Sequence, residues 1–448
     1  MERLNLQVRV ARSPELAAHE ITLATRALEA GDHAKAQRLY AGMASVALHH
    51  SISWGNLSAL ALGLGDLAAA QRHAARALAM DEANADAWVN LGAARWDAGL
   101  RQEAAQATQR ALQLASGHEA AALNLALMLR AAGQVDAARG LLDRASAASP
   151  RSWRLAQALA EVARLQMDHV VARSAILRSL PVRLAECDLR QPARSGLRPG
   201  TGADVRTALA ASCDRLDALG VEYHLMAGTL LAIVKDGRLF AHDKDVDLAL
   251  PDLAPDQREA VHGAFAADAD YRMFPPPPLA TGQAASVIGL VHVPTGVGID
   301  LILPQRDPDG RMRNSMGWPD QLESVLRPYG IGTMQWDGRD WPVPEPTGQH
   351  LEDMYGPDWR DQLHTAAGVT YDRCYSDTMV SNPSRTAEST PRAVTLGLIR
   401  LVRILGSNEW PKAVAYCAQL LAREEIPQVR TALAKLQGAG HSGLRFDG

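Results

Sequence analysis

The chain has 448 residues, of which 47% are hydrophobic, 21% are charged and only 5% are aromatic, and its formal net charge is −4. At about 150 residues per domain, this length predicts two or three domains, each able to bury its own core. The composition excludes a small disulfide-stapled module and argues against long disordered tracts. The weak net charge argues against a protein that binds nucleic acid.

The cysteines and the first residues bear on the compartment. The four cysteines form no pair at a metal-binding or redox spacing; they are Cys187, Cys213, Cys374 and Cys417. The chain begins without the apolar run of a secretion signal, and no stretch reaches the roughly 20 apolar residues needed to cross a bilayer. We therefore expect a cytoplasmic protein with no transmembrane segment. Peripheral attachment to the inner membrane face is the alternative.

Glycines recur every 34 residues in the first half of the chain, at Gly31, Gly65, Gly99 and Gly133. A small residue follows each of them five positions later, and the series continues into a fifth unit: Ala36, Ala70, Ala104, Ala138 and Ala172. In a helix pair of this length, the glycine ends the first helix and the alanine lies where two helices cross closely. One leucine register should form the buried face: Leu23, Leu57, Leu91, Leu125 and Leu159.

This segment resembles tetratricopeptide repeats. Different units carry different parts of the tetratricopeptide pattern. These parts are an early tryptophan (Trp54), a Leu-Gly pair (Leu91 and Gly92), the turn glycine, the alanine and a late proline (Pro150). The resemblance implies an all-α domain of five units over residues 15–186, stacked as a right-handed solenoid with a concave groove. Such a groove would hold a protein or peptide partner. The alternative is a rigid spacer without a ligand.

Residues 187–202 are rich in Pro, Gly, Ser and Arg and are predicted to be a linker. The pattern that follows alternates helices and strands: helix 203–219, strand 221–226, helix 229–235, strand 246–250, helix 255–266, and strands 285–293 and 297–303 joined by a tight turn. This order predicts an α/β or α+β domain with a mixed sheet, over residues 203–385.

Three aspartates in this domain are candidates for a metal site. Asp245 and Asp247 are two residues apart in a strand, so both side chains leave the same face of the sheet. Asp300 lies in a later apolar strand that could run beside them. Carboxylates that converge in this way repel one another unless a divalent cation is bound, and oxygen ligands favour Mg²⁺ or Mn²⁺. Asp243 is an additional candidate ligand, with a solvated loop as the alternative.

The residues from Ala227 to Thr229 link a strand to a helix. At such a place, backbone amides and a hydroxyl can hold phosphate oxygens at the positive end of the helix. Together with the metal site, this is a layout for phosphoryl transfer. The cation would neutralise charge on a leaving diphosphate, and Asp300 would accept the proton of an attacking hydroxyl.

The run AGTLLAIVKDGRLFAHDKDVD, residues 227–247, resembles the LicD and fukutin family of nucleotidyltransferase-fold phosphotransferases. That family's signature, Gly-Thr-Leu-Leu-Gly, then Arg-x-x-Gly, then Asp-Asp-Asp-Ile-Asp, aligns with the run without a gap. Residues 299–304 are similar to the family's later hydrophobic-Asp-hydrophobic segment. Residues 343–359, from VPEP to LEDMYGPDW, are similar to its closing Tyr-Gly-x-x-Trp element. The resemblance spans about residues 205–365.

The resemblance implies metal-dependent transfer of a phospho-alcohol, such as phosphocholine or ribitol phosphate, from a CDP-linked donor to a hydroxyl of a glycan acceptor. By position, Asp245 and Asp247 would ligate the metal and Asp300 would be the third acid. The implied substrate-binding residues are Gly228, Thr229, Lys235 and Lys244. Lys244 stands where most members have the middle Asp, although fukutin also has Lys there. Lys235 replaces the usual Arg and keeps its charge without the bidentate fork.

Residues 386–448 form a C-terminal segment that becomes helical after Thr390 and Pro391 and breaks at Pro411. Two or three helices are expected, packed on either the repeats or the catalytic domain. The favoured function is an enzyme that modifies a cell-envelope glycan, guided by its repeats. One alternative is a repeat adaptor with a catalytically silent domain. The other is a nucleotidyltransferase that adds AMP or UMP to a protein.

Overall fold

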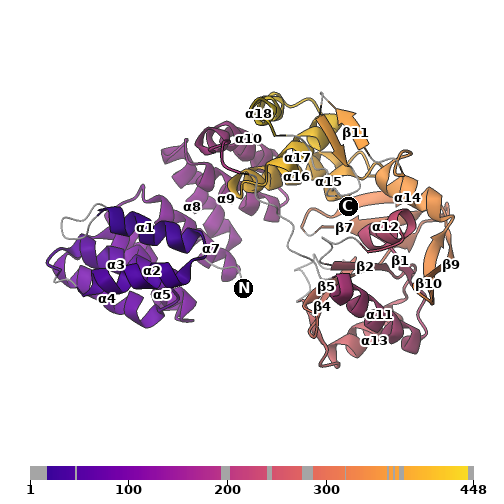
Figure 1. Ribbon diagram of the computed structural model, residues 1–448, viewed down its shortest axis with the longest axis horizontal. Helices are drawn as coiled ribbons and strands as arrows, with labels where there is room; N and C mark the ends of the chain where they lie inside the picture. The colour runs from indigo at the N-terminus through magenta and orange to yellow at the C-terminus, as the bar shows by residue number, and fades with distance from the viewer. Residues whose placement is uncertain are drawn as a thin grey trace. The chain divides into compact units, whose positions relative to one another are not determined.

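The computed structural model describes residues 18–45, 48–192, 202–239, 245–274, 286–317, 319–360, 363–366, 369–372 and 378–441. The chain divides into two compact units, residues 1–166 and 167–448, and each is described by itself (Figure 1). Within the described residues, no helix has both the length and the apolar character needed to span a membrane. Cys187, Cys213 and Cys417 are free thiols. Cys374 lies outside the described residues.

The first unit consists of consecutive helices that pack in sequence order on their neighbours (Figure 1). They are α1 (Ala18–Glu29), α2 (His33–Ala44), α3 (Ser51–Gly63), α4 (Leu67–Met80), α5 (Ala85–Asp97), α6 (Arg101–Leu114), α7 (Glu119–Ala131), α8 (Val135–Ala148) and α9 (Trp153–Leu165). The next helix, α10 (His169–Glu186), follows at the same spacing. The predicted helix pairs are confirmed, and the region is TPR-like.

The turn inside each pair has the conformation that the glycine spacing predicts. Gly31, Gly65, Gly99 and Gly133 have φ of +75°, +82°, +84° and +74°, and Met167 adopts +58° in the fifth unit. The alanines five positions after the glycines are buried at the helix crossings. The leucine register is also buried except for Leu23, which is half-buried. Leu23 lies in α1, which has a described neighbouring repeat on one side only.

Two glycine-to-alanine substitutions should have opposite effects in this unit. Gly99→Ala is expected to lower the free energy of unfolding by about 1 kcal/mol, because alanine must then adopt a left-handed conformation. Gly42 lies inside α2 with no heavy atom within 4 Å of an added Cβ. Gly42→Ala should therefore raise the free energy of unfolding by about 0.5–1 kcal/mol through helix propensity. Urea unfolding followed by far-UV circular dichroism measures both, and effects of the same sign would contradict this account of the turn.

The second unit is built on a five-stranded mixed sheet with the order β1-β2-β5-β4-β3. Its elements are α11 (Gly202–Leu219), β1 (His224–Leu225), α12 (Ala227–Asp236), β2 (Asp245–Ala249), α13 (Pro255–Ala266), β3 (Tyr271–Met273), β4 (Val287–His292) and β5 (Val297–Ile302). Among these described strands, β2 and β5 are the one parallel pair. The mixed sheet is confirmed. Strand β1 is shorter than predicted, because only His224 and Leu225 pair with β2, and Met226 is already the N-cap of α12.

The two faces of this sheet differ in chemistry. Val246, Leu248, Ile299 and Leu301 are buried in one core cluster, which also contains apolar residues of α11. Helix α11 contacts both β2 and β5. On the opposite face, the three acids and Gly298 are half-buried, whereas the last residues of the two strands, Ala249 and Ile302, are buried. The alternation of the sequence therefore separates an apolar face from an accessible polar one.

Further strands follow, which the hydrophobic pattern does not predict. Strands β6 (Gln305–Arg306), β7 (Met312–Met316) and β8 (Leu322–Leu326) form a three-stranded sheet. Two hairpins are β9 (Gly330–Trp336) with β10 (Arg339–Glu345), and β11 (Leu363–Ala366) with β12 (Val369–Asp372). The helices are α14 (Thr347–Tyr355), α15 (Thr378–Ser381), α16 (Thr390–Gly406), α17 (Trp410–Arg423) and α18 (Pro427–Gly438). The described part of the C-terminal segment thus contains three helices, and Pro411 lies in the first turn of α17.

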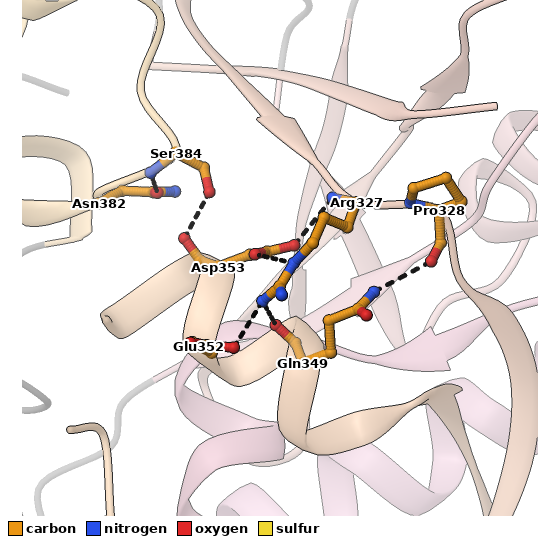
Figure 2. A network of polar contacts seen from close by, with 7 residues as sticks. All are labelled: Arg327, Pro328, Gln349, Glu352, Asp353, Asn382 and Ser384. Carbon is orange, nitrogen blue, oxygen red and sulfur yellow. Dashed lines mark hydrogen bonds and ion pairs between the residues drawn. The ribbon is translucent and has the colours of Figure 1, made fainter. Parts of the chain in front are cut away.

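Helix α14 is held by a network around one arginine, which Figure 2 shows. Arg327 follows β8 and binds Asp353 through its backbone N–H (2.8 Å) and its Nε (2.7 Å). Its Nη2 donates to Glu352 Oε2 at 2.7 Å, and the hydroxyl of Ser384 donates to the Asp353 carbonyl at 2.7 Å. Tyr355 ends α14 and is buried in the core with Trp359. The aromatic residues of the closing element are therefore packing groups.

The C-terminal helices pack on α10 and on the sheet domain. Helix α16 lies against α10 and also contacts β8, and α18 contacts α10. The Trp410 indole N–H donates to the Gln191 carbonyl at 3.0 Å, and Arg173 of α10 pairs with Glu424 at 2.5 Å. Helix α10 therefore belongs to the second unit, whereas its sequence spacing assigns it to the repeats. Residues 193–201, most of the predicted linker, lie outside the described residues.

Candidate functional site

The three predicted acids come together on the accessible face of the five-stranded sheet. Asp247 of β2 is the direct partner of Asp300 of β5 in the parallel register. Asp245 is two residues before Asp247 and pairs with Gly298 in the same ladder. Residues that oppose one another across a ladder, or alternate along a strand, point to the same face. The side chains of all three acids therefore lie on one face, and each is half-buried.

Crowding of these acids affects their ionisation. Burial, and in second place the negative charge of Asp245, raise the pKa of Asp300 to about 6. A carboxylate with such a pKa is a stronger proton acceptor than an ordinary aspartate. The same repulsion is what a bound cation would relieve. The geometry therefore suits proton transfer and cation binding at the same position.

The strand-to-helix turn beside the acids is tied to them through the backbone. The Met226 N–H donates to the Asp247 carbonyl at 3.1 Å, and the next residue, Ala227, has a left-handed φ of +45°. Helix α12 begins there without a side-chain cap. Gly228 is half-buried in its first turn. Because the first amides of a helix lack intrahelical acceptors, this turn can bind an anion next to Asp247.

Thr229 has a different contact from the predicted one. Its side chain is only 1% exposed, and its hydroxyl oxygen accepts a hydrogen bond from the Asp247 N–H at 3.0 Å. The burial leaves no accessible surface on which a donor phosphate could bind. Thr229 therefore positions β2 and Asp247, and the predicted phosphate contact of its side chain is corrected to this role.

The structure describes one of the two predicted lysines. Lys235 is half-buried in the last turn of α12, seven residues after Gly228 and so about 10 Å from it along the helix axis. Its predicted contact with the donor stays a prediction. Lys244 and the additional candidate Asp243 lie outside the described residues.

The donor set fits a hard divalent cation. The three acids offer only carboxylate oxygens, from rigid strands and on an accessible face, which suits Mg²⁺ or Mn²⁺. In the described part of the chain, no three His, Cys, Asp or Glu side chains already stand at metal-ligating separation. A cation would therefore have to draw the carboxylates closer together than they stand here.

The raised pKa of Asp300 predicts how stability depends on pH. The folded pKa of about 6 lies above the usual 3.8, so the stabilising contribution is complete below about pH 4 and is lost as the pH rises through 6. With chelator present, Asp300→Asn should remove this loss and raise the free energy of unfolding at neutral pH by about 2–3 kcal/mol. Urea unfolding at about pH 5 and pH 7.5 measures it. The exposed Asp256 of α13 provides the control, Asp256→Asn. If the free energy of unfolding of Asp300→Asn depended on pH as in the unmodified protein, the raised pKa of Asp300 would be contradicted.

Gly289 was not singled out by the sequence reasoning. It pairs with Asp300 from β4 and lies beside it on the accessible face. A glycine inside an otherwise alternating strand indicates a place where another group approaches the backbone closely. That signal was available in the sequence, but its meaning depends on the partner strand.

The comparisons with known proteins return structural likenesses only. No family model and no curated protein matches the chain. Among solved structures, one of MamA is 20% identical and matches 37% of this chain and 96% of its own with a TM-score of 0.30. A thermophilic TPR protein in Thermus thermophilus is 17% identical, with coverages of 36% and 89% and a TM-score of 0.32. Pseudomonas aeruginosa pilF is 18% identical, with coverages of 37% and 81% and a TM-score of 0.31.

These scores are too low for any of the three proteins to inform the function of this chain. The TPR-like description rests instead on the 34-residue spacing and on the helix pairs themselves. The chain thus consists of a TPR-like helical region, a mixed sheet with three acids on its accessible face, and C-terminal helices that pack on α10 and β8.

Proposed function

We propose that the second unit is a metal-dependent transferase of the LicD and fukutin type. It would move a phospho-alcohol, such as phosphocholine or ribitol phosphate, from a CDP-linked donor to a hydroxyl of a glycan. The observation that carries the proposal is the register of β2 and β5, in which Asp247 opposes Asp300 and Asp245 shares their face. Acids that converge from two parallel strands are suited to holding a cation against a diphosphate.

Each residue then has a part in the reaction. A divalent cation held by Asp245 and Asp247 would neutralise the charge on the leaving nucleotide. The first-turn amides of α12 would hold the donor phosphate, and Thr229 would keep Asp247 in place through its hydroxyl. Asp300 would accept the proton as the acceptor oxygen bonds to the phosphorus of the phospho-alcohol. The bond from that phosphorus to the CMP oxygen breaks, and CMP leaves.

The TPR-like region supports a role in binding a protein or peptide. Stacked helix pairs present an extended surface suited to a polypeptide. In the transferase proposal, this region brings the enzyme to a partner or to its acceptor.

A second candidate is an adaptor in which the repeats bind a partner and the sheet domain is catalytically silent. The observation that favours it is the regular array of helix pairs. Such arrays form extended surfaces that bind other proteins without any catalytic group. A third candidate, transfer of AMP or UMP to a protein, uses the same acids.

One assay separates the three candidates. The purified protein is incubated with Mg²⁺ or Mn²⁺, CDP-choline or CDP-ribitol and a panel of glycans, and CMP release is measured. Parallel reactions with labelled ATP or UTP test for labelled protein. CMP release that requires a glycan supports the proposal, and labelled protein supports the third candidate. No turnover in either assay, with partner binding unchanged in Asp245→Ala and Asp247→Ala, supports the adaptor.

A further inference from the structure

One row of residues crosses the accessible face of the sheet through three strands and ends at the residue after a fourth. Asp247 of β2 pairs with Asp300 of β5, and Asp300 pairs with Gly289 of β4. The row continues to Phe274, just after β3, whose N–H donates to the Gly289 carbonyl at 2.9 Å. Cross-strand partners share a face. Two carboxylates, a glycine and an aromatic ring therefore stand side by side.

The glycine leaves space that the aromatic ring and the carboxylate both border. A Cβ added at Gly289 would lie 3.0 Å from Phe274 Cδ2 and 3.6 Å from Asp300 Oδ1. The Phe274 ring therefore leans over the bare backbone of β4 toward the acid. Its side chain is nevertheless 51% exposed. An exposed aromatic face beside a carboxylate is a surface on which a ligand ring can stack.

The neighbouring row of residues on the same face begins with an acid and ends with an arginine. Asp245 pairs with Gly298, Gly298 with Val291, and Val291 with Arg272, which is exposed on the same face as Phe274. Each row thus has a glycine between its acid and its last residue: Gly289 lies between Asp300 and Phe274, and Gly298 lies between Asp245 and Arg272. A guanidinium on the same face as the ring disfavours binding of a ligand with a quaternary ammonium group. It suits the hydroxyl or carboxylate oxygens of a sugar.

We propose that Phe274 is the stacking platform for a pyranose ring of the acceptor, held so that its hydroxyl points to Asp300. Arg272 would bind oxygen atoms of the same sugar. This inference rests on the proposed transfer reaction and adds the residues that bind the acceptor. The ring borders the same space as the Asp300 carboxylate, which suits the group that bears the attacking hydroxyl. A donor base would be separated from the reacting phosphorus by a ribose and a phosphate.

Binding is tested without turnover. Saturation-transfer-difference NMR is recorded with methyl α-D-glucopyranoside, methyl β-D-galactopyranoside and methyl β-D-glucuronide, on the full chain and its variants. We expect the signal of a bound pyranoside to fall at least about fivefold in Phe274→Ala and to persist in Phe274→Tyr. Val293 is equally exposed, at 51%, so Val293→Ala is the matched control and should have no effect. No signal with the unmodified protein, or an unchanged signal in Phe274→Ala, would contradict the proposal that Phe274 binds a pyranose ring.

Kinetics then separate the platform from the transfer reaction. Phe274→Ala should raise the KM for the glycan about threefold to tenfold, with the KM for the CDP-alcohol and kcat nearly unchanged. Gly289→Ala should act in the same direction, because its Cβ would displace the ring. A change in the donor KM alone would place the base on Phe274 and overturn the inference. Absence of transfer in the unmodified protein would overturn the proposed function, while the NMR result still decides whether Phe274 binds a sugar.

Discussion

Asp247→Asn and Asp300→Asn are each expected to lower the transfer rate at least about a thousandfold, because each removes a negative oxygen that a cation or a proton requires. The reason lies in the register: Asp247 and Asp300 are direct partners, so one substitution affects the whole site. Asparagine keeps nearly the same volume, so the sheet should fold as before. CMP release at saturating donor measures the effect.

A second readout does not depend on turnover. Isothermal titration with Mn²⁺ should show affinity weakened at least about tenfold in both variants. Asp256→Asn, on the exposed side of α13, should change neither the rate nor the affinity. If both site variants retained Mn²⁺ binding and transfer, the acids would have no role in the reaction and the transferase proposal would fall.

Trp410→Ala is expected to destabilise the second unit by about 3–5 kcal/mol, because it removes a fully buried indole and a hydrogen bond. Trp410 is 0% exposed, and its N–H binds the Gln191 carbonyl at 3.0 Å. This contact joins α17 to the segment that follows α10. Urea unfolding, together with hydrogen exchange measured peptide by peptide, reports the change. Exchange should rise in α10 and in α16 to α18 together.

Two controls sharpen this result. Trp410→Phe keeps most of the buried apolar volume and should cost much less. Val170 is 81% exposed on α10, so Val170→Ala should leave the stability of the unit nearly unchanged. Faster exchange in α17 alone, with α10 still protected, would contradict the packing of α10 with the C-terminal helices.

The sequence was most informative where the interactions are local. A glycine every 34 residues predicted the turns correctly, because a left-handed cap is a property of one residue and its helix. Met167 takes the same conformation without being glycine, so the position in the repeat outweighs the residue type there. The placement of Asp245 and Asp247 on one face likewise followed from the period of a strand.

Other features depended on residues far apart in the chain. The hydroxyl of Thr229 looked suited to a phosphate, but folding buries it against the backbone of Asp247. Gly289 and Phe274 carry no motif, and they become significant only when β4 and β3 extend the row from Asp300. Helix α10 follows the repeat spacing, yet its contacts lie with α16 and α18.

By itself, the sequence determined the helix-pair repeat, the mixed α and β character of the second half and the three candidate acids, because each depends on periodicity or on neighbouring residues. The tertiary structure alone decided that β5 runs parallel to β2 in a register that sets Asp300 opposite Asp247. It also decided where the C-terminal helices pack. The physical reason is that strand pairing and helix docking are chosen by the joint burial of distant apolar surfaces, which no local pattern specifies.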